Sequence, residues 1–149
     1  MKTLTIHTSP TLDIYAVSTD TKLDLILVDQ GISAGFPSPA QDFTERTIDL
    51  NKELIKNISS TFLARAKGES MINAGIGSGD LLVIDKSLNP TDGKVAICFI
   101  DGEFTVKRIK LDKDCCWLIP ANDDYKPIKV TDENDFTIWG IVTFVIKAL

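Results

Sequence analysis

Ser70 and Lys107 are the two residues of this sequence whose types and surroundings could support peptide-bond chemistry. Ser70 follows Gly68 and Glu69, and a serine after a glycine turn can present its hydroxyl group beside free backbone amides. A nucleophilic serine needs a neighbouring base, yet His7 is the single histidine and lies in a segment that we expect outside the core. A Ser-His-Asp triad is therefore disfavoured, which leaves a lysine or a carboxylate as the base.

Lys107 lies in an alternating run that predicts a β-strand over residues 103–109. Alternation places Thr105, Lys107 and Ile109 on one face of this strand. The neighbouring residues are apolar or uncharged, so the strand could bury the amine. Burial would have to lower the pKa of the amine from its usual value of about 10.4 towards neutrality before Lys107 could act as a base. Taken alone, the residue also fits an ordinary exposed lysine on a strand.

Short strand-like runs separated by turn residues dominate the sequence from residue 61 onwards. The expected strands cover residues 61–66, 80–85, 94–100, 103–109, 116–120 and 136–146. Asp101-Gly102 lies between two of these runs and is a strong signal for a two-residue hairpin turn. The pattern predicts a mainly β fold, built as a strongly bent and mostly antiparallel β-structure. One short helix is expected at residues 50–57, with Asp49 as its N-cap.

The first 34 residues differ from the rest of the chain. They contain strand-length apolar patches that are too short to form a core alone. Residues 31–40 are rich in glycine, serine and proline, which favours an extended conformation that a protease could accept. We therefore expect residues 1–34 to form an extended N-terminal arm, followed by a β domain over residues 35–149.

Composition restricts the class of protein. A chain of 149 residues with 44% hydrophobic and 25% charged residues predicts one globular domain with its own core. A net charge of −5 disfavours direct binding of nucleic acid. Cys98, Cys115 and Cys116 lack the spacing of a disulfide framework or a zinc site. No segment resembles a signal peptide or a membrane span, so we expect a cytoplasmic protein with reduced cysteines and without metal or another cofactor.

Four motifs occur in an order that resembles the UmuD and LexA family of self-cleaving Ser-Lys proteins. They are Gly35-Phe36-Pro37-Ser38-Pro39, Gly68-Glu69-Ser70-Met71, Gly79-Asp80-Leu81-Leu82-Val83-Ile84-Asp85 and Asp101-Gly102-Glu103-Phe104-Thr105-Val106-Lys107. The resemblance covers residues 31 to 149, and the motifs are specific in combination although each is weak alone. The family's curled, mostly antiparallel β-structure agrees with the strands expected from the sequence.

The resemblance implies a role for each of these positions. Ser70 would be the nucleophile, Lys107 the general base, and Ala34-Gly35 the bond that the protein cuts in itself. The backbone amides of Glu69 and Ser70 would contribute to an oxyanion hole, a role that does not depend on the side chain at position 69. The family also implies stimulation by a RecA filament on single-stranded DNA. Its product would be the accessory subunit of an error-prone translesion polymerase of the UmuC-like Y-family, within the SOS response.

Other functions stay open at the level of the sequence. The chain could be a non-catalytic interaction module in which Ser70 and Lys107 are structural. It could also be the catalytic half of a LexA-like repressor. That interpretation lacks a DNA-binding domain, because residues 1–34 hold two lysines against four aspartates and are too short for a helix-turn-helix unit. A membrane-bound signal peptidase would use the same residue pair but would need an anchor.

The C-terminal run at residues 136–146 is apolar on both faces of the expected strand. Each apolar face of a strand needs a cover, and a small curled sheet supplies one core. Either a helix or the docked N-terminal arm covers the second face, or the strand lies near the two-fold contact of a homodimer. The family resemblance also implies the homodimer.

Overall fold

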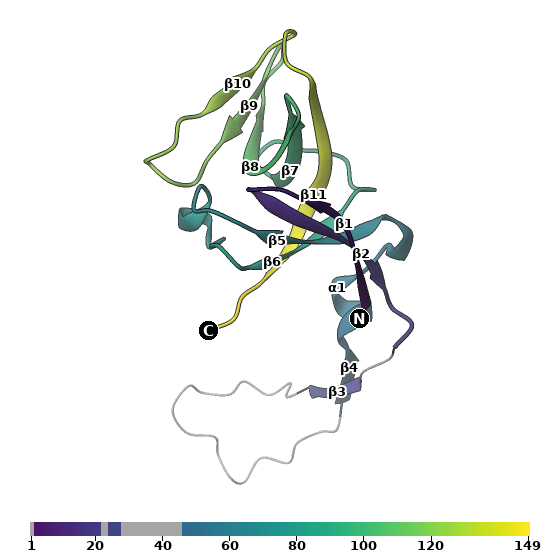
Figure 1. The fold of residues 1–149 in the computed structure, drawn as a ribbon. Helices are drawn as coiled ribbons and strands as arrows, with labels where there is room; N and C mark the ends of the chain where they lie inside the picture. The colour runs from purple at the N-terminus through teal and green to yellow at the C-terminus, as the bar shows by residue number, and fades with distance from the viewer. Residues whose placement is uncertain (1, 22–23, 28–45) are drawn as a thin grey trace.

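The computed structural model describes residues 2–21, 24–27 and 46–149. The predicted cleavage site at Ala34-Gly35 and the predicted extended segment 31–40 lie outside these residues. Nine strands form one sheet in the order β1-β2-β5-β6-β11-β7-β8-β9-β10, and β3 and β4 form a separate pair (Figure 1). All neighbouring strands are antiparallel. The strands are β1 (Lys2–Thr8), β2 (Leu12–Ser18), β3 (Asp24–Leu27), β4 (Arg46–Asp49), β5 (Thr61–Ala66), β6 (Leu81–Asp85), β7 (Val95–Ile100), β8 (Glu103–Leu111), β9 (Cys116–Ile119), β10 (Ile128–Val130) and β11 (Phe136–Ile146). The predicted fold class, a curled and mostly antiparallel β-structure, is confirmed.

Strand β11 connects the two halves of the large sheet. Its first half pairs with β7, its second half pairs with β6, and Ile141 has a partner on both sides. The register shifts between Ile138 and Gly140 and again beyond Val142, so the strand bends as it passes from one neighbour to the other. Figure 1 shows β11 running from the group β7–β10 to β5 and β6. This bend brings the strand that carries Lys107 towards the end of β5.

The hairpin between β7 and β8 has the predicted turn. Asp101 and Gly102 have φ values of 48° and 87°, and a tight hairpin turn of the I′ type needs positive φ at both central residues. The Asp101 carboxylate accepts hydrogen bonds from Asn134 Nδ2 at 2.7 Å and from the Asp135 amide at 3.0 Å. The turn fixes a register in which Lys107 lies opposite Ala96 in β7.

Two apolar clusters occupy opposite faces of β7 and β8. Ile97 and Val106 belong to the larger cluster, which also contains the buried residues of β2, β5 and β6. Cys98 and Ile109 belong to a smaller cluster with Leu118 of β9. Cys98 is fully buried. Because both faces of β8 contact apolar residues, a polar side chain on this strand can lie away from water.

The N-terminal segment joins the sheet. Strands β1 and β2 form a hairpin, and β2 pairs with the edge of β5. Leu12 and Ile14 are only 0% and 1% exposed and lie in the larger apolar cluster. His7 packs edge-on against Phe104 with 4.8 Å between the ring centroids. The expectation that the segment around His7 lies outside the core is therefore wrong, because the alternating side chains of β2 complete the core beside β5.

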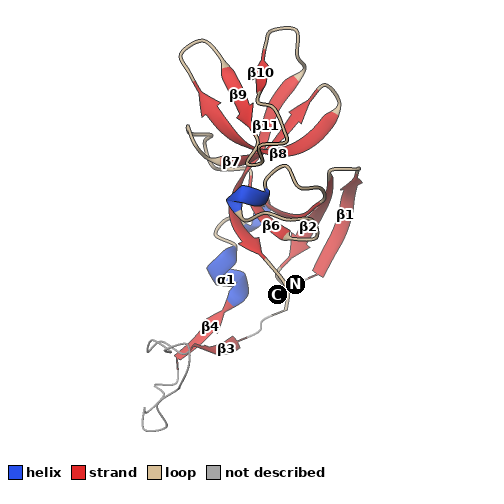
Figure 2. Ribbon diagram, turned by 90° about the vertical axis from the view of Figure 1, so that its left-hand side faces the viewer, coloured by secondary structure: helices blue, strands red, loops and turns tan. Residues whose placement is uncertain are grey.

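The predicted short helix is present as α1 (Leu50–Leu54), and the carboxylate of its N-cap Asp49 accepts a hydrogen bond from the Asn51 amide at 3.0 Å. The helix ends before the expected residue 57 because Ile55 turns to an extended backbone and is buried. Figures 1 and 2 show the β3–β4 pair beyond α1, away from the large sheet. None of the helices in the described segments is long and apolar enough to cross a membrane.

The bend of β11 depends on a close approach at Gly140, which generates a prediction. A Cβ atom at this position would lie 2.5 Å from Ile84 Cγ2, well inside van der Waals contact. Gly140→Ala should therefore lower the free energy of unfolding by about 1–3 kcal/mol, as overpacking does in cores. Gly77→Ala is the control, because its Cβ would approach no atom closer than 3.6 Å. Equal denaturant midpoints for the two variants would contradict this account.

Candidate active site

Ser70 lies in the turn that follows β5. The chain leaves the strand at Ala66, and Gly68 has a φ of +88°, a conformation that residues with side chains rarely adopt. Met71 is buried in the larger apolar cluster, directly after the serine. A 3-10 turn over Ile72–Ala74 follows. Because Met71 is buried and Gly68 forms the turn, Ser70 is held at the edge of the larger apolar cluster.

The segment after β9 clamps the Ser70 turn from the other side. The Ala121 amide donates a hydrogen bond of 2.8 Å to the carbonyl oxygen of Ser70, and the Asn73 amide donates one of 2.8 Å to the Ala121 carbonyl. Asn122 Nδ2 donates a hydrogen bond of 2.9 Å to the Glu69 carbonyl. These bonds use carbonyl groups of the turn and leave the Ser70 hydroxyl available for other partners.

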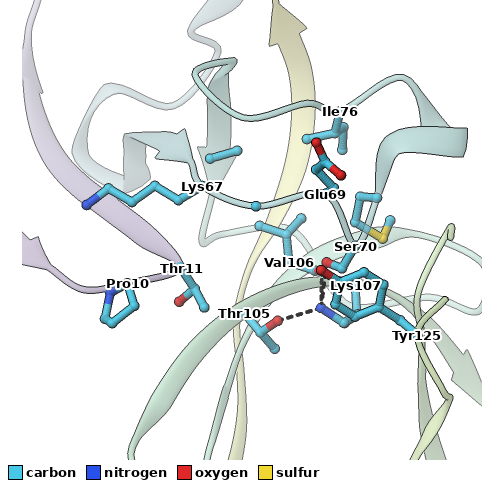
Figure 3. A pocket seen from close by; sticks show the side chains of 13 residues that line it. Pro10, Thr11, Lys67, Glu69, Ser70, Ile76, Thr105, Val106, Lys107 and Tyr125 are labelled. Carbon is cyan, nitrogen blue, oxygen red and sulfur yellow. Dashed lines mark hydrogen bonds between the residues drawn. The ribbon is translucent and has the colours of Figure 1, made fainter.

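Lys107 reaches Ser70 from β8. Its Nζ lies 2.9 Å from Ser70 Oγ and 2.7 Å from Thr105 Oγ1 (Figure 3). It also lies 3.0 Å from the carbonyl oxygen of Val106. The side chains of Thr105 and Lys107 share a face of β8, as the alternation predicted. Lys107 is 7% exposed, and no acidic side chain contacts its amine among the described residues. The structure thus brings the two sequence-predicted residues into hydrogen-bond contact.

Burial lowers the pKa of the Lys107 amine, and the nearby Cys98 opposes this shift. A neutral amine has two N–H donors and one lone pair. The three partners of Nζ match these groups. The Val106 carbonyl accepts one N–H, and the hydroxyl oxygen of Thr105 can accept the other. The lone pair is then free to accept the Ser70 proton. The arrangement therefore suits a neutral lysine acting as a base.

The backbone beside Ser70 has donors available for an oxyanion. Among the hydrogen bonds of the described residues, none is donated by the amides of Glu69 or Ser70. Amides in such a turn can stabilise the negative oxygen of a tetrahedral intermediate. Figure 3 shows the Glu69 side chain directed away from the Lys107 amine, so its carboxylate does not compete for the proton.

A pocket of about 190 Å³ opens over Ser70 and Lys107. Tyr125 lies at one side of it, and Pro10 and Thr11 of the N-terminal hairpin line another (Figure 3). The sequence reasoning missed these three residues and did not assign a role to Thr105. The alternation of β8 contained the signal for Thr105, whereas no local pattern indicates that residues 10, 11 and 125 meet at this pocket.

Comparison with known proteins identifies relatives of the chain. The family model described as Peptidase S24-like matches residues 26–143. Protein SamA of Salmonella typhimurium is 45% identical over 113 residues, which cover 76% of this chain and 78% of SamA. Protein MucA of Escherichia coli is 40% identical over 115 residues, 76% of this chain and 78% of MucA. The LexA repressor of Alcanivorax borkumensis is 41% identical over 116 residues, 78% of this chain but 56% of the repressor. The family resemblance drawn from the sequence motifs is confirmed.

The lowered pKa of Lys107 predicts a pH dependence of stability. Between the folded-state pKa and the usual lysine value of about 10.4, the unfolded chain binds more protons at this position than the folded chain. The contribution of Lys107 to the free energy of unfolding should therefore increase as pH rises through this range. Lys107→Met lacks the titrating group and should lack this increase, while remaining folded because methionine suits the apolar surroundings.

The measurement is denaturant unfolding of the original chain and of Lys107→Met at several pH values from neutral to about 10. Lys110→Met, a change at an exposed position of the same strand, controls for the general effect of alkali. A constant difference between the original chain and Lys107→Met across the range would contradict a depressed pKa.

Proposed function

This chain belongs to the Peptidase S24-like family, and we propose that it is a serine endopeptidase that cuts its own Ala34-Gly35 bond and functions in SOS mutagenesis. The family contains self-cleaving serine peptidases such as LexA and UmuD. SamA and MucA are UmuD-like SOS mutagenesis proteins. The observation that carries the proposal is the 2.9 Å contact between Ser70 Oγ and the buried amine of Lys107.

The proposed reaction uses the lone pair of neutral Lys107. The amine takes the Ser70 proton while Oγ attacks the carbonyl carbon of Ala34, and the amides of Glu69 and Ser70 stabilise the resulting oxyanion. The protonated amine then gives its proton to the nitrogen of Gly35 as the C–N bond breaks. An acyl-enzyme remains on Ser70. The same amine then takes a proton from a water molecule as the water oxygen attacks the ester carbon. It returns this proton to Ser70 Oγ as the ester C–O bond breaks, which frees the new carboxyl group of Ala34.

Tethering supplies the substrate at high effective concentration. A protein that cuts its own chain needs no extended pocket for a free peptide, and the pocket here measures only about 190 Å³. The small residues Ala34 and Gly35 would let the backbone approach Ser70 closely. The product would be residues 35–149, a chain of 115 residues (149 − 34).

The SOS setting is part of the proposal and is supported by the relatives. We infer that a RecA filament on single-stranded DNA stimulates the cut, in the cytoplasm. The shortened chain would then serve a UmuC-like Y-family polymerase in error-prone translesion synthesis. The net charge of −5 favours protein partners over direct contact with DNA.

A homodimer completes the proposal. Phe144, Val145 and Ile146 at the end of β11 are 39%, 38% and 41% exposed in the single chain. Leu54 of α1 and Phe144 line the same pocket, but among the described residues no strand pairs with the β7-facing edge of β11 beyond Ile141. Phe144 and Ile146 share one face of β11, and exposed apolar side chains at an open strand edge are typical of a contact between subunits. We therefore infer that a second copy covers them.

The cleavage proposal predicts that Ser70→Ala and Lys107→Met each remain folded and lose self-cleavage by roughly 10³-fold or more. The original chain, incubated with a RecA filament on single-stranded DNA, should yield a 115-residue product that begins at Gly35. Intact mass and N-terminal sequencing identify the bond. Ala34→Trp should block the cut by clashing beside Ser70, whereas Ala34→Gly should permit it.

The matched controls are Ser78→Ala, at an exposed serine in the same region, and Lys110→Met, at an exposed lysine of β8. Both controls should cut at the original rate. Normal cleavage by a folded Ser70→Ala or Lys107→Met variant would refute the assigned roles. A folded chain that never cuts itself would support the non-catalytic interaction module instead.

The dimer proposal predicts that Phe144→Asp shifts the chain from dimer to monomer at micromolar concentration, measured by light scattering. Burying a carboxylate in an apolar contact is costly, whereas Thr137→Asp changes an exposed residue of the same strand and should leave the dimer intact. A monomeric mass for the original chain, before and after cleavage, would exclude the homodimer.

A further inference from the structure

The N-terminal hairpin, defined here as β1 and β2 (residues 2–18), is bound to the sheet along a full strand edge. Five residues of β2 pair with β5, from Leu12 opposite Ala66 to Ala16 opposite Phe62. The family match begins at residue 26, after both strands of this hairpin. The hairpin is therefore an element that the Peptidase S24-like family model does not describe.

Burial at the hairpin is as deep as anywhere in the molecule. Leu12 and Ile14 are 0% and 1% exposed and contribute to the same cluster as Met71, the residue that follows Ser70. Removing the hairpin would open this cluster to water and would leave β5 as an edge strand paired only with β6. The core beside the serine is thus incomplete without residues 2–18.

Polar contacts hold the turn of the hairpin beside the pocket. Lys67 Nζ lies 2.9 Å from the Ser9 carbonyl oxygen and 2.8 Å from Asp13 Oδ1, while the Lys67 amide donates a hydrogen bond of 3.0 Å to the Thr11 carbonyl. The Thr11 hydroxyl donates a hydrogen bond to the Phe104 carbonyl in β8. These contacts connect the hairpin to both β5 and β8, the strands that position Ser70 and Lys107.

We propose that the N-terminal hairpin remains bound to the sheet after the chain is cut, so that the β5 edge is the binding surface for the chain's own severed N-terminal segment. The inference rests on the proposed cleavage at Ala34-Gly35, which lies beyond the hairpin in sequence. The sequence predicted an arm that self-cleavage removes. The contacts of the hairpin indicate instead that cutting the Ala34-Gly35 bond does not by itself release the hairpin. Once the covalent link is lost, retention depends on noncovalent contacts, which are those of the hairpin together with the short pairing of β3 with β4.

Retention has a consequence for the pocket. Pro10 and Thr11 line the same pocket as Ser70, so a bound hairpin preserves this wall in the cut protein (Figure 3). Release would require a replacement for the strand on β5, because an exposed edge beside an open apolar core invites association with other chains. A partner that displaces the hairpin would have to add a strand with apolar residues at alternate positions.

The test separates the hairpin from the cleavage chemistry. A recognition sequence for a site-specific protease is inserted between Pro39 and Ala40 of the full Ser70→Ala chain, and the added protease makes the cut. Gel filtration at about 10 µM and native mass spectrometry should then find both pieces together in equal numbers, as two copies of each in the proposed dimer. Because Ser70 takes no part, failure of the proposed self-cleavage would leave this result unchanged.

Three variants identify the contacts responsible. Ile14→Asp places a carboxylate in the core and should release the N-terminal piece after cutting, whereas Leu4→Asp, at a 70% exposed position of the same hairpin, should not. Leu12→Ala is the milder change if Ile14→Asp fails to fold before cutting, and it should weaken retention by about tenfold or more.

The proposal is overturned if the N-terminal piece of the Ser70→Ala chain elutes alone while the body keeps its circular dichroism spectrum. Aggregation of the body with the N-terminal piece free in solution is also release and overturns the proposal in the same way. Equal retention in Leu4→Asp and Leu12→Ala would show that the buried face of β2 is not the binding surface, which contradicts the proposal as well.

Discussion

The arrangement of this molecule depends on one buried amine. Lys107 lies among apolar and uncharged groups, and its Nζ contacts the hydroxyl groups of Ser70 and Thr105 without a carboxylate partner among the described residues. Burying a charged ammonium in this way is unfavourable, so the fold favours the neutral form that a base requires. A strand with apolar clusters on both faces provides the low-dielectric surroundings, and β8 is such a strand.

The proposed nucleophile and the proposed base come from opposite halves of the sheet, and β11 determines how closely the halves approach. Ser70 follows β5, which pairs with β6, whereas Lys107 lies in β8, which pairs with β7. β11 pairs with both β6 and β7, and its bend at Gly140 allows the backbone to pass close to Ile84. The contact between Ser70 and Lys107 thus depends on Gly140, although β11 contributes no residue to the pocket.

Local patterns in the sequence predicted the parts of the fold that local interactions determine. The alternation of β8 and the turn at Asp101-Gly102 are set by neighbouring residues, and both were predicted from them. Strand β2 was not predicted, because its apolar alternation is short and its partner β5 lies about 50 residues further along the chain. The same limit explains why the clamp of Ala121 on the Ser70 turn was missed. The contact between Ser70 and Lys107 is equally non-local, and the family's motifs, rather than the periodicity of the strands, predicted it.

The anchoring of the segments on both sides of the proposed scissile bond explains how a small pocket can select one peptide bond. Ala34-Gly35 lies between β3 and β4, and the pairing of Leu27 with Arg46 closes the 18-residue connection from 28 to 45 at its base. Upstream, β2 is bound to β5, and downstream, β4 leads directly into α1. A substrate anchored on both sides needs few contacts at the reacting atoms, because the connection already limits which bonds can reach a serine. Specificity can then reside in the connection rather than in the walls of the pocket, which agrees with a site built from one serine, one lysine and the backbone of a turn.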